Sequence, residues 1–338
     1  MRAPDCGRSG SADWRGRMPA TRIAGSDVFA APRRRQFTLR KFVFWDRMNA
    51  AFFAVTHFGA LLAPFTYTPA ALRCFLLANL VCGLVGITFC YHRLLSHRSF
   101  AVPWPVEYCA AVCGLLACQG GPVEWVSHHR HHHAGCDTPA DPHSPYEGLW
   151  HAHAGWLLDW DATVARAGDR RNAADLAAQP FYAHLDEHHM WYILLSMVVL
   201  FGLGGLPYLV WGFFLRVTFA FHYTWAVNSL AHVYGVQAYR TGDLSRNLAP
   251  LCLVTWGDSW HHNHQLRART GMTGAHCRVA ATNARARPAR SAFAWSARHG
   301  LEWWQADPTW WLIRALELAG VATRVQQPSA AQKAKLAL

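Results

Sequence analysis

Residues 48–67 read MNAAFFAVTHFGALLAPFTY and residues 74–91 read CFLLANLVCGLVGITFCY, and neither stretch contains Asp, Glu, Lys or Arg. A helix needs about 20 apolar residues to cross the roughly 30 Å hydrocarbon core of a bilayer, and both stretches are close to that length. Thr68 and Pro69 follow the first stretch, and proline favours a turn there. The sequence therefore predicts a helical hairpin that crosses a membrane and returns.

A second apolar region extends from Met190 to Leu230 and contains one charged residue, Arg216. The run GGLP at 204–207 interrupts it and predicts a turn, so we expect a second hairpin. Residues 104–121 are also apolar, but Glu107 interrupts them, and we expect an interfacial or re-entrant helix. The prediction is an all-α integral membrane protein with four transmembrane helices in two hairpins.

Positive charge is concentrated in two segments. The formal net charge is +12, yet residues 1–41 carry ten Lys or Arg against three Asp, and residues 265–290 carry six Arg and no acid. The remainder is nearly neutral, which argues against a nucleic-acid partner. The composition of residues 1–41 fits a plastid or mitochondrial transit peptide, with a disordered tail as the alternative. Basic residues at 33–41 and at 92–93 flank the first hairpin, which places both of its ends in the cytosol or stroma.

Histidines are the second decisive feature. The chain has 21, and ten of them stand in tight groups at 92–97, 128–133 and 261–264, with His232 between the last two. Residues three and four apart share one face of a helix, so His129, His132 and His133 can point at a single site. Eight or nine converging imidazoles exceed the four ligands of a structural zinc ion. The pattern predicts two metal ions, and redox metals that activate O2 are the ones that such a membrane enzyme would need.

The chain resembles the membrane fatty acyl desaturase family, in particular the delta-9 type that includes stearoyl-CoA desaturases and plant and cyanobacterial acyl-lipid desaturases. The resemblance extends from about Phe42 to Val325. It rests on three motifs in order: HRLLSH at 92–97, HRHHH at 129–133 and HHNH at 261–264. The segments DPHSP at 141–145, VNS at 227–229 and SARHGLEWW at 296–304 also match the family.

The resemblance implies a cytosolic or stromal helical cap that holds a di-iron site above the four spans. It implies iron ligands at His92, His97, His129, His132, His133, His232, His261 and His264. It also implies that Asn228 holds a metal-bound water, and it leaves His128, His131 and His262 at positions that do not bind metal. Gln119, Trp125 and Thr224 correspond to residues that line the bend of the acyl tunnel, although packing at the membrane interface is the alternative for Trp125.

The function implied is an O2-dependent acyl desaturase, an oxidoreductase of fatty acid biosynthesis. It would insert a cis double bond, expected at carbon 9 with carbon 7 left open, into a saturated acyl-CoA or acyl-glycerolipid. Electrons would come from a separate protein, either ferredoxin in a plastid membrane or cytochrome b5 in the endoplasmic reticulum. A histidine-box membrane hydroxylase and a non-enzymatic membrane metal-binding protein are the alternatives.

The third motif departs from the family. A fifth histidine is expected after His264, but Gln265 stands there, and Ala292-Phe293, which should follow directly, comes 26 residues later. A retained intron explains this, because removing it would join the first bases of the Gln265 codon to the last base of the Ser291 codon and give His. A genuine insertion with His276 as a substitute ligand is the alternative, and a chain that keeps residues 265–291 is expected to be catalytically impaired. The predicted organisation is thus an extension at 1–41, a desaturase domain at 42–325 and a tail at 326–338.

Overall fold

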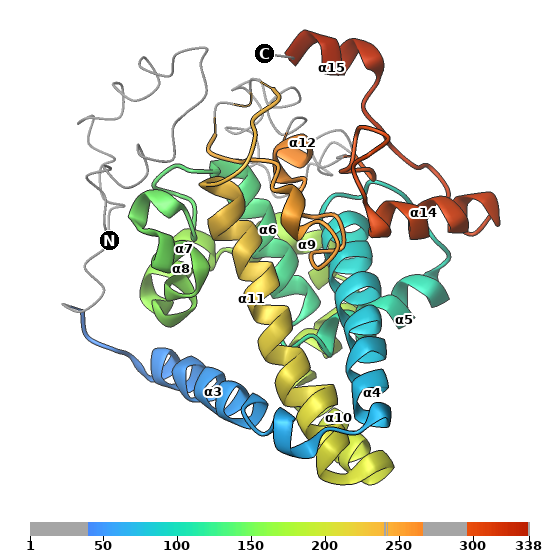
Figure 1. Ribbon diagram of the computed structural model, residues 1–338. Helices are drawn as coiled ribbons and strands as arrows, with labels where there is room; N and C mark the ends of the chain where they lie inside the picture. Colours follow the sequence, from blue (N-terminus) through green and yellow to red (C-terminus); the bar gives the residue numbers. More distant parts are fainter. Residues whose placement is uncertain (1–39, 240, 242, 266–295, 337–338) are drawn as a thin grey trace.

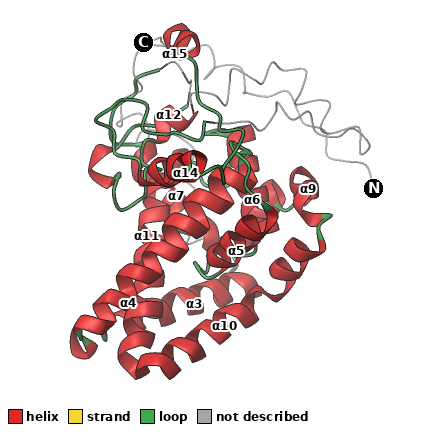
Figure 2. Ribbon diagram, turned by 90° about the vertical axis from the view of Figure 1, so that its right-hand side faces the viewer, coloured by secondary structure: helices red, strands yellow, loops and turns green. Residues whose placement is uncertain are grey.

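The described part of the chain is built from helices (Figures 1 and 2). The computed structural model describes residues 40–239, 241, 243–265 and 296–336. Within these ranges the only extended pairings are isolated bridges, such as that between Ala101 and Thr323. Residues 1–39 of the predicted extension (1–41) and residues 266–291 of the atypical segment (265–291) lie outside the described residues. The all-helical expectation is confirmed.

The region predicted to form the first hairpin contains α3 (Phe44–Ala60) and α4 (Pro69–Asn79), and α4 continues without a break into the π-helical η3 (Leu80–Ser96). α3 ends earlier than the uncharged stretch predicts, because the chain enters a short 3-10 turn, η2 (Ala63–Thr66), with proline at its start. The Thr68 hydroxyl caps α4 by accepting from the Ala71 amide at 3.0 Å. The resulting helix Pro69–Ser96 is 28 residues long and apolar enough to cross a membrane.

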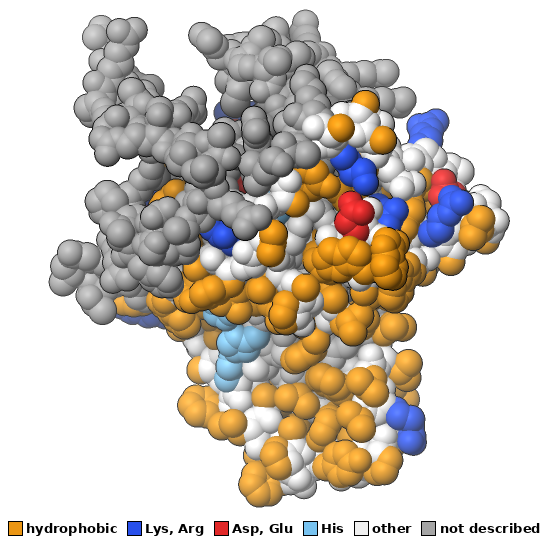
Figure 3. Space-filling model, turned by 45° about the horizontal axis from the view of Figure 1, so that its top comes forward, with side chains coloured by type: hydrophobic (Ala, Val, Ile, Leu, Met, Phe, Trp, Pro, Cys, Tyr) orange, Lys and Arg blue, Asp and Glu red, His pale blue; other side chains and the backbone are white. Residues whose placement is uncertain are grey.

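The second apolar region forms α10 (Pro180–Leu209), η7 (Val210–Leu215), α11 (Arg216–Ser229) and η8 (Leu230–His232). The predicted break is present, since Gly204 and Gly205 have non-helical backbone angles and Gly205 has φ +62°. Pro180–His232 is the second region apolar enough to cross a membrane, and only 11% of its most apolar window is buried inside the protein. Figure 3 shows the corresponding broad apolar surface on the lower part of the molecule.

The helix α5 (Trp104–Leu115) has 12 residues and is therefore about 18 Å long, too short to span a bilayer. It packs closely on η3, because a Cβ at Gly86 would come within 2.4 Å of the Gly114 amide nitrogen. The buried Arg216 of α11 donates from Nη1 to the Leu116 carbonyl at the end of α5, at 2.7 Å. This hydrogen bond joins α5 to the second hairpin.

The remaining helices form a cap at one end of the two hairpins, the upper end in Figure 1. They are α6 (Pro122–Gly135), η4 (Pro145–Glu147), α7 (Leu149–His153), η5 (Gly155–Leu158), α8 (Trp160–Ala167), η6 (Arg170–Ala173), α9 (Ala174–Ala177), η9 (Ala249–Leu251), α12 (His261–Gln265), α14 (Pro308–Leu318) and α15 (Ala330–Leu336). Asp186 of α10 fixes the start of α6, since its Oδ1 accepts from the amides of Val123 and Glu124 at 3.1 Å each. This contact orients the helix that carries five histidines.

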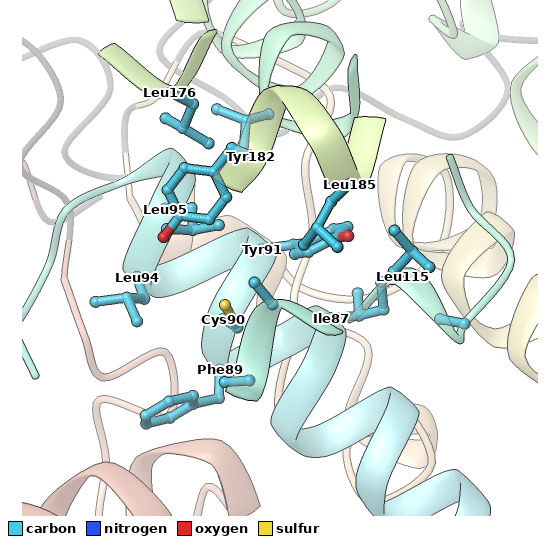
Figure 4. Close-up of a cluster of buried hydrophobic side chains, with 14 of the residues drawn as sticks. Ile87, Phe89, Cys90, Tyr91, Leu94, Leu95, Leu115, Leu176, Tyr182 and Leu185 are labelled. Atoms are coloured by element: carbon cyan, nitrogen blue, oxygen red, sulfur yellow. The ribbon is translucent and has the colours of Figure 1, made fainter. Parts of the chain in front are cut away.

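A buried apolar cluster supports the end of η3 where the cap begins (Figure 4). Leu176 of α9 and Leu185 of α10 lie against Tyr91 and Leu95 of η3, and Leu115 of α5 closes the cluster. These five side chains are almost completely inaccessible to solvent. Burying such a side chain contributes roughly 1.5–3 kcal/mol, so the cluster holds the last turn of η3, with its histidines, firmly in place.

Candidate metal centre

The structure brings all eight predicted ligand histidines together where the hairpins meet the cap. They come from the end of η3, from α6, from η8 and from α12. Seven of them are buried, and His129 is partly buried. They form two groups, within each of which the candidate ligand atoms lie within 4.8 Å of one another. This division agrees with the prediction of two metal ions.

The first group contains five imidazoles: His92, His97, His129, His133 and His264. Their Nε2 atoms face one another. The Nε2 atoms of His97 and His129 are 2.7 Å apart, those of His129 and His133 2.9 Å, those of His133 and His264 3.0 Å, and those of His264 and His92 3.1 Å. Ring nitrogens that converge in this way form a ready ligand set for a metal that prefers imidazole.

The second group contains three imidazoles, those of His132, His232 and His261. The side chain of Gln265 completes the ring of donors around them. Its Nε2 lies 3.3 Å from His132 Nε2 and 3.4 Å from His261 Nε2, and its Oε1 lies 3.1 Å from Nδ1 of His133. An amide therefore occupies the place where the family motif has its last histidine.

Burial favours the neutral form of five of these imidazoles, whereas at His232 the effect of burial is outweighed by the Asp137 carboxylate, which raises the pKa. Burial lowers the pKa of His97, His129, His133, His261 and His264 well below the ordinary histidine value, and the proximity of the other histidines lowers it further. A histidine must be deprotonated to bind a metal ion, so the electrostatics favour the ligand form at these five positions.

Three buried carboxylates orient the ligands, a feature that the sequence reasoning did not identify. Nδ1 of His92 lies 2.7 Å from Oδ2 of Asp258, Nδ1 of His132 lies 3.1 Å from Asp141, and Nδ1 of His232 lies 3.0 Å from Asp137. Each carboxylate fixes the tautomer that leaves Nε2 free for a metal, an arrangement typical of metal sites. Asp141 belongs to the segment at 141–145 that matches the family, and Asp258 lies three residues before the third histidine motif. This closeness to the motifs was the only signal in the sequence.

The carboxylate of Asp258 is shared with two further buried side chains. Nη2 of Arg93 lies 3.1 Å and Nδ1 of His299 3.2 Å from its Oδ1. Burial opposes the ionisation of Asp258, but the charges of His92 and Arg93 and the hydrogen bonds from His299 and His92 hold its pKa well below the usual range. Burial and the charge of Arg93 lower the pKa of His299 to about 4. His299 packs on the ring of His264 and was not predicted as a site residue.

The three histidines predicted not to bind metal lie outside both groups. His131 contacts the carbonyl of Asp169, and His262 lies between Ser245 and Tyr239. His128 packs against Trp156. These contacts give each ring a partner away from the centre.

The predicted substrate residues form a hydrogen-bonded chain beside the metal centre. Nε1 of Trp125 donates to Oε1 of Gln119 at 3.1 Å, and Nε2 of Gln119 donates to the Thr224 hydroxyl at 3.0 Å. Trp125 stacks on His129 with ring centroids 5.1 Å apart. Trp125, Thr224 and Asn228 line a cavity whose wall also includes His92, His132 and His261. An apolar chain in this cavity would lie against both histidine groups.

Comparison with known proteins agrees with this geometry. The family model described as fatty acid desaturase matches residues 69–270. A palmitoyl-monogalactosyldiacylglycerol delta-7 desaturase, chloroplastic, from Arabidopsis thaliana is 40% identical over 94% of this chain and 78% of its own length. An icosanoyl-CoA 5-desaturase from Limnanthes douglasii is 42% identical over 93% of this chain and 82% of its own length.

A third relative, delta-9 acyl-lipid desaturase 1 from Arabidopsis thaliana, is 42% identical over 94% of this chain and 95% of its own length. The family match includes all three histidine motifs, and the similarity to these relatives extends over nearly the whole chain. The protein belongs to the fatty acid desaturase family.

Proposed function

We propose that this acyl desaturase introduces a cis double bond at carbon 9 of a saturated acyl chain carried by CoA or by a glycerolipid. The reaction consumes O2, two electrons and two protons and yields the unsaturated chain and two waters. The observation that carries the proposal is the convergence of eight histidines in two groups beside one cavity. The names of the relatives include carbons 9, 7 and 5 and both kinds of acyl carrier.

The metal ions in this proposal are two iron ions. His92, His97, His129, His133 and His264 would hold one, and His132, His232 and His261 would hold the other, with Asn228 acting through a water. Bound iron supplies the oxidising power that removes hydrogen from an unactivated methylene, which no side chain can do. Asp137, Asp141 and Asp258 keep the ligands oriented.

The position of the double bond along the acyl chain depends on how the cavity holds the substrate. The chain of Trp125, Gln119 and Thr224 fixes the wall nearest the histidines, and we assign these residues to substrate positioning. A displacement of about 1 Å at the reacting carbon can reduce the rate 100-fold. The rigid wall therefore selects which methylene faces the metal centre.

The proposed setting is a plastid membrane or the endoplasmic reticulum, with four spans and the cap in the stroma or cytosol. The apolar surface of the hairpins supports membrane insertion, and the chloroplastic name of one relative supports a plastid. The electron donor would be a separate ferredoxin or cytochrome b5. The proposed desaturase domain is 42–325, preceded by a transit peptide at 1–41 and followed by a tail at 326–338.

Expression of the full chain in yeast that lacks its own desaturase tests the proposal. Fatty-acid methyl esters are analysed by mass spectrometry, and the double bond is located after derivatisation. We expect monounsaturated C16 or C18 chains with the bond at carbon 9. Hydroxylated chains would instead identify a hydroxylase, and a bond at carbon 7 or 5 would correct the position.

Gln265 favours a second candidate, a catalytically impaired desaturase. Its amide stands among the ligands of the second group, where amides bind transition metals less well than imidazole does. In that case the yeast would contain the protein but no new unsaturated chains.

A further inference from the structure

The second histidine group supplies three imidazoles, one fewer than the four ligands of a typical protein-bound zinc ion. They belong to His132, His232 and His261. His232 is only 1% exposed, and its Nε2 has no hydrogen-bond partner among the described residues. Its Nδ1 is held by Asp137 at 3.0 Å, so the ring is fixed while Nε2 stays free to bind a ligand.

Cys136 places a thiol beside this group. The residue is partly buried, follows α6 directly and stands four positions after His132. Its Sγ lies 3.8 Å from Nε2 of His132 and within 4.8 Å of a ring nitrogen of His232. Two of the three imidazoles in the second group therefore have the same sulfur atom as a neighbour.

The separation of sulfur and nitrogen fits a shared metal ion. Zinc–sulfur bonds of about 2.3 Å and zinc–nitrogen bonds of about 2.0–2.1 Å place the two atoms about 3.6 Å apart at a tetrahedral angle. The observed separation from His132 is 3.8 Å. Gln265 lies close to the same imidazole, with its Nε2 3.3 Å from Nε2 of His132, but a carboxamide binds transition metals less well than a thiolate does. Cys136 is thus the stronger of the two donors that adjoin His132.

The free thiol of Cys136 is protonated. Burial raises its pKa well above the ordinary value, and the carboxylates of Asp137, Asp243 and Asp141 raise it further. The S–H donates to Oδ2 of Asp137, with 3.6 Å between sulfur and oxygen. Because the thiolate is the form that binds a metal ion, binding would release this proton. Asp137 contacts both Cys136 and His232, so one carboxylate orients two donors of the same group.

We propose that Cys136 is a further ligand of the second group, which then binds one divalent metal ion through His132, His232, His261 and Cys136. Three imidazoles and a thiolate are a donor set that favours Co²⁺ and Zn²⁺ over Fe²⁺. The thiolate supplies the donor that Gln265 does not. This inference rests on the proposed function only in that the second group is taken to hold a metal ion. It is independent of the acyl carrier and of the position of the double bond.

Cobalt absorption tests the thiolate directly. A cobalt–thiolate bond gives an intense charge-transfer band in the near ultraviolet, which cobalt bound by imidazole alone does not give. Purified full-length protein in detergent is dialysed to equilibrium against CoCl2 at several concentrations, and absorption and cobalt per chain are measured. The matched control is C252S, which removes another partly buried thiol that belongs to neither histidine group. We expect the band in wild type and C252S and its loss in C136S, which should also bind its second cobalt ion at least about 10-fold more weakly.

A double variant separates a ligand from a residue that only supports the fold. In the Q265H background an imidazole supplies the fourth donor, so C136S should cost little cobalt affinity there, whereas a purely structural thiol would cost the same in both backgrounds. If C136S does not fold, C136A replaces it. A band in C136S equal to that of wild type, or no band in wild type, would overturn the proposal. Either result would leave the desaturase function standing, because that function is judged by the fatty acids formed in yeast.

Discussion

Single residues determine how strongly the two histidine groups can bind iron. The first group has five imidazoles, whereas the second has three and the amide of Gln265. Neutral imidazole is a stronger ligand for iron than a carboxamide, so the two halves of the centre should differ in affinity. The difference arises from one side chain that lies within 3.4 Å of two ligand nitrogens.

Replacing this residue tests the difference directly. Gln265→His supplies the missing imidazole, and we expect iron content to rise from about one to about two ions per chain, with a gain in desaturase activity. Iron is measured by mass spectrometry on purified protein, and Gln265→Asn serves as the control that keeps an amide. Equal iron in wild type, Q265H and Q265N would show that this position does not limit metal binding.

Site residues were predicted from the sequence where their role shows in local spacing, and they were missed where it depends on a distant contact. Box histidines such as His129 and His133 were predicted because their ligand role shows in local spacing. Asp137 was missed because its partner, His232, is 95 residues away, and only the folded chain brings them together.

Helices determine where these residues point. α6 carries three of the eight predicted ligands, His129, His132 and His133, on its last two turns. The start of α6 is held by Asp186, which belongs to α10 and also contacts Arg170 at 2.6 Å. The orientation of the second histidine box thus depends on a contact with the second hairpin.

Removing this contact should weaken the helix. Asp186→Ala leaves the amides of Val123 and Glu124 without their acceptor, and the loss of such a cap costs about 1 kcal/mol. We expect a Tm lower by roughly 2 °C in detergent and weaker iron retention. Asp161→Ala, in an exposed position on α8, is the matched control. A D186A protein as stable as D161A would contradict this role.

The sequence predicted which regions form helices better than it predicted where each helix ends. The uncharged stretch 48–67 predicted one span, but α3 ends at Ala60 because the chain turns before Pro64. The break at Gly204 and Gly205 was predicted, since glycine tolerates the positive φ that this turn requires. Apolar composition identifies a region that is buried or inserted in a membrane. The positions of the turns inside that region depend on individual residues.

The whole molecule divides into an apolar half and a polar cap. Exposed apolar side chains are concentrated on α3, α4 and α10, and include Phe58, Leu77 and Val198. The histidine groups lie at the junction between the two halves. In the proposed membrane setting, an acyl chain would approach from the lipid, and protons and electrons would approach through the cap.

The proposed four-span topology makes a prediction about the two connections farthest from the cap. Tyr67 is exposed at the turn before α4, and Gly202 is exposed just before the break in α10. Asp161 is exposed on the cap. In oriented microsomes an impermeant maleimide should label Y67C and G202C from one side and D161C from the other. The exposed native Cys109 is first replaced by serine, as are Cys6 and Cys277, which lie outside the described residues. Labelling of Y67C and D161C from the same side would exclude the topology.

The division of the histidines into two groups has a consequence for the order in which the site forms during translation. Four of the five proposed ligands in the first group, His92, His97, His129 and His133, are made before residue 134, and only His264 comes late. The second group gains His232 and His261 only after the second hairpin has been made. The first group is therefore nearly complete while translation is still under way, and the second cannot begin to close until three quarters of the chain has emerged. The two halves of the centre mature in sequence.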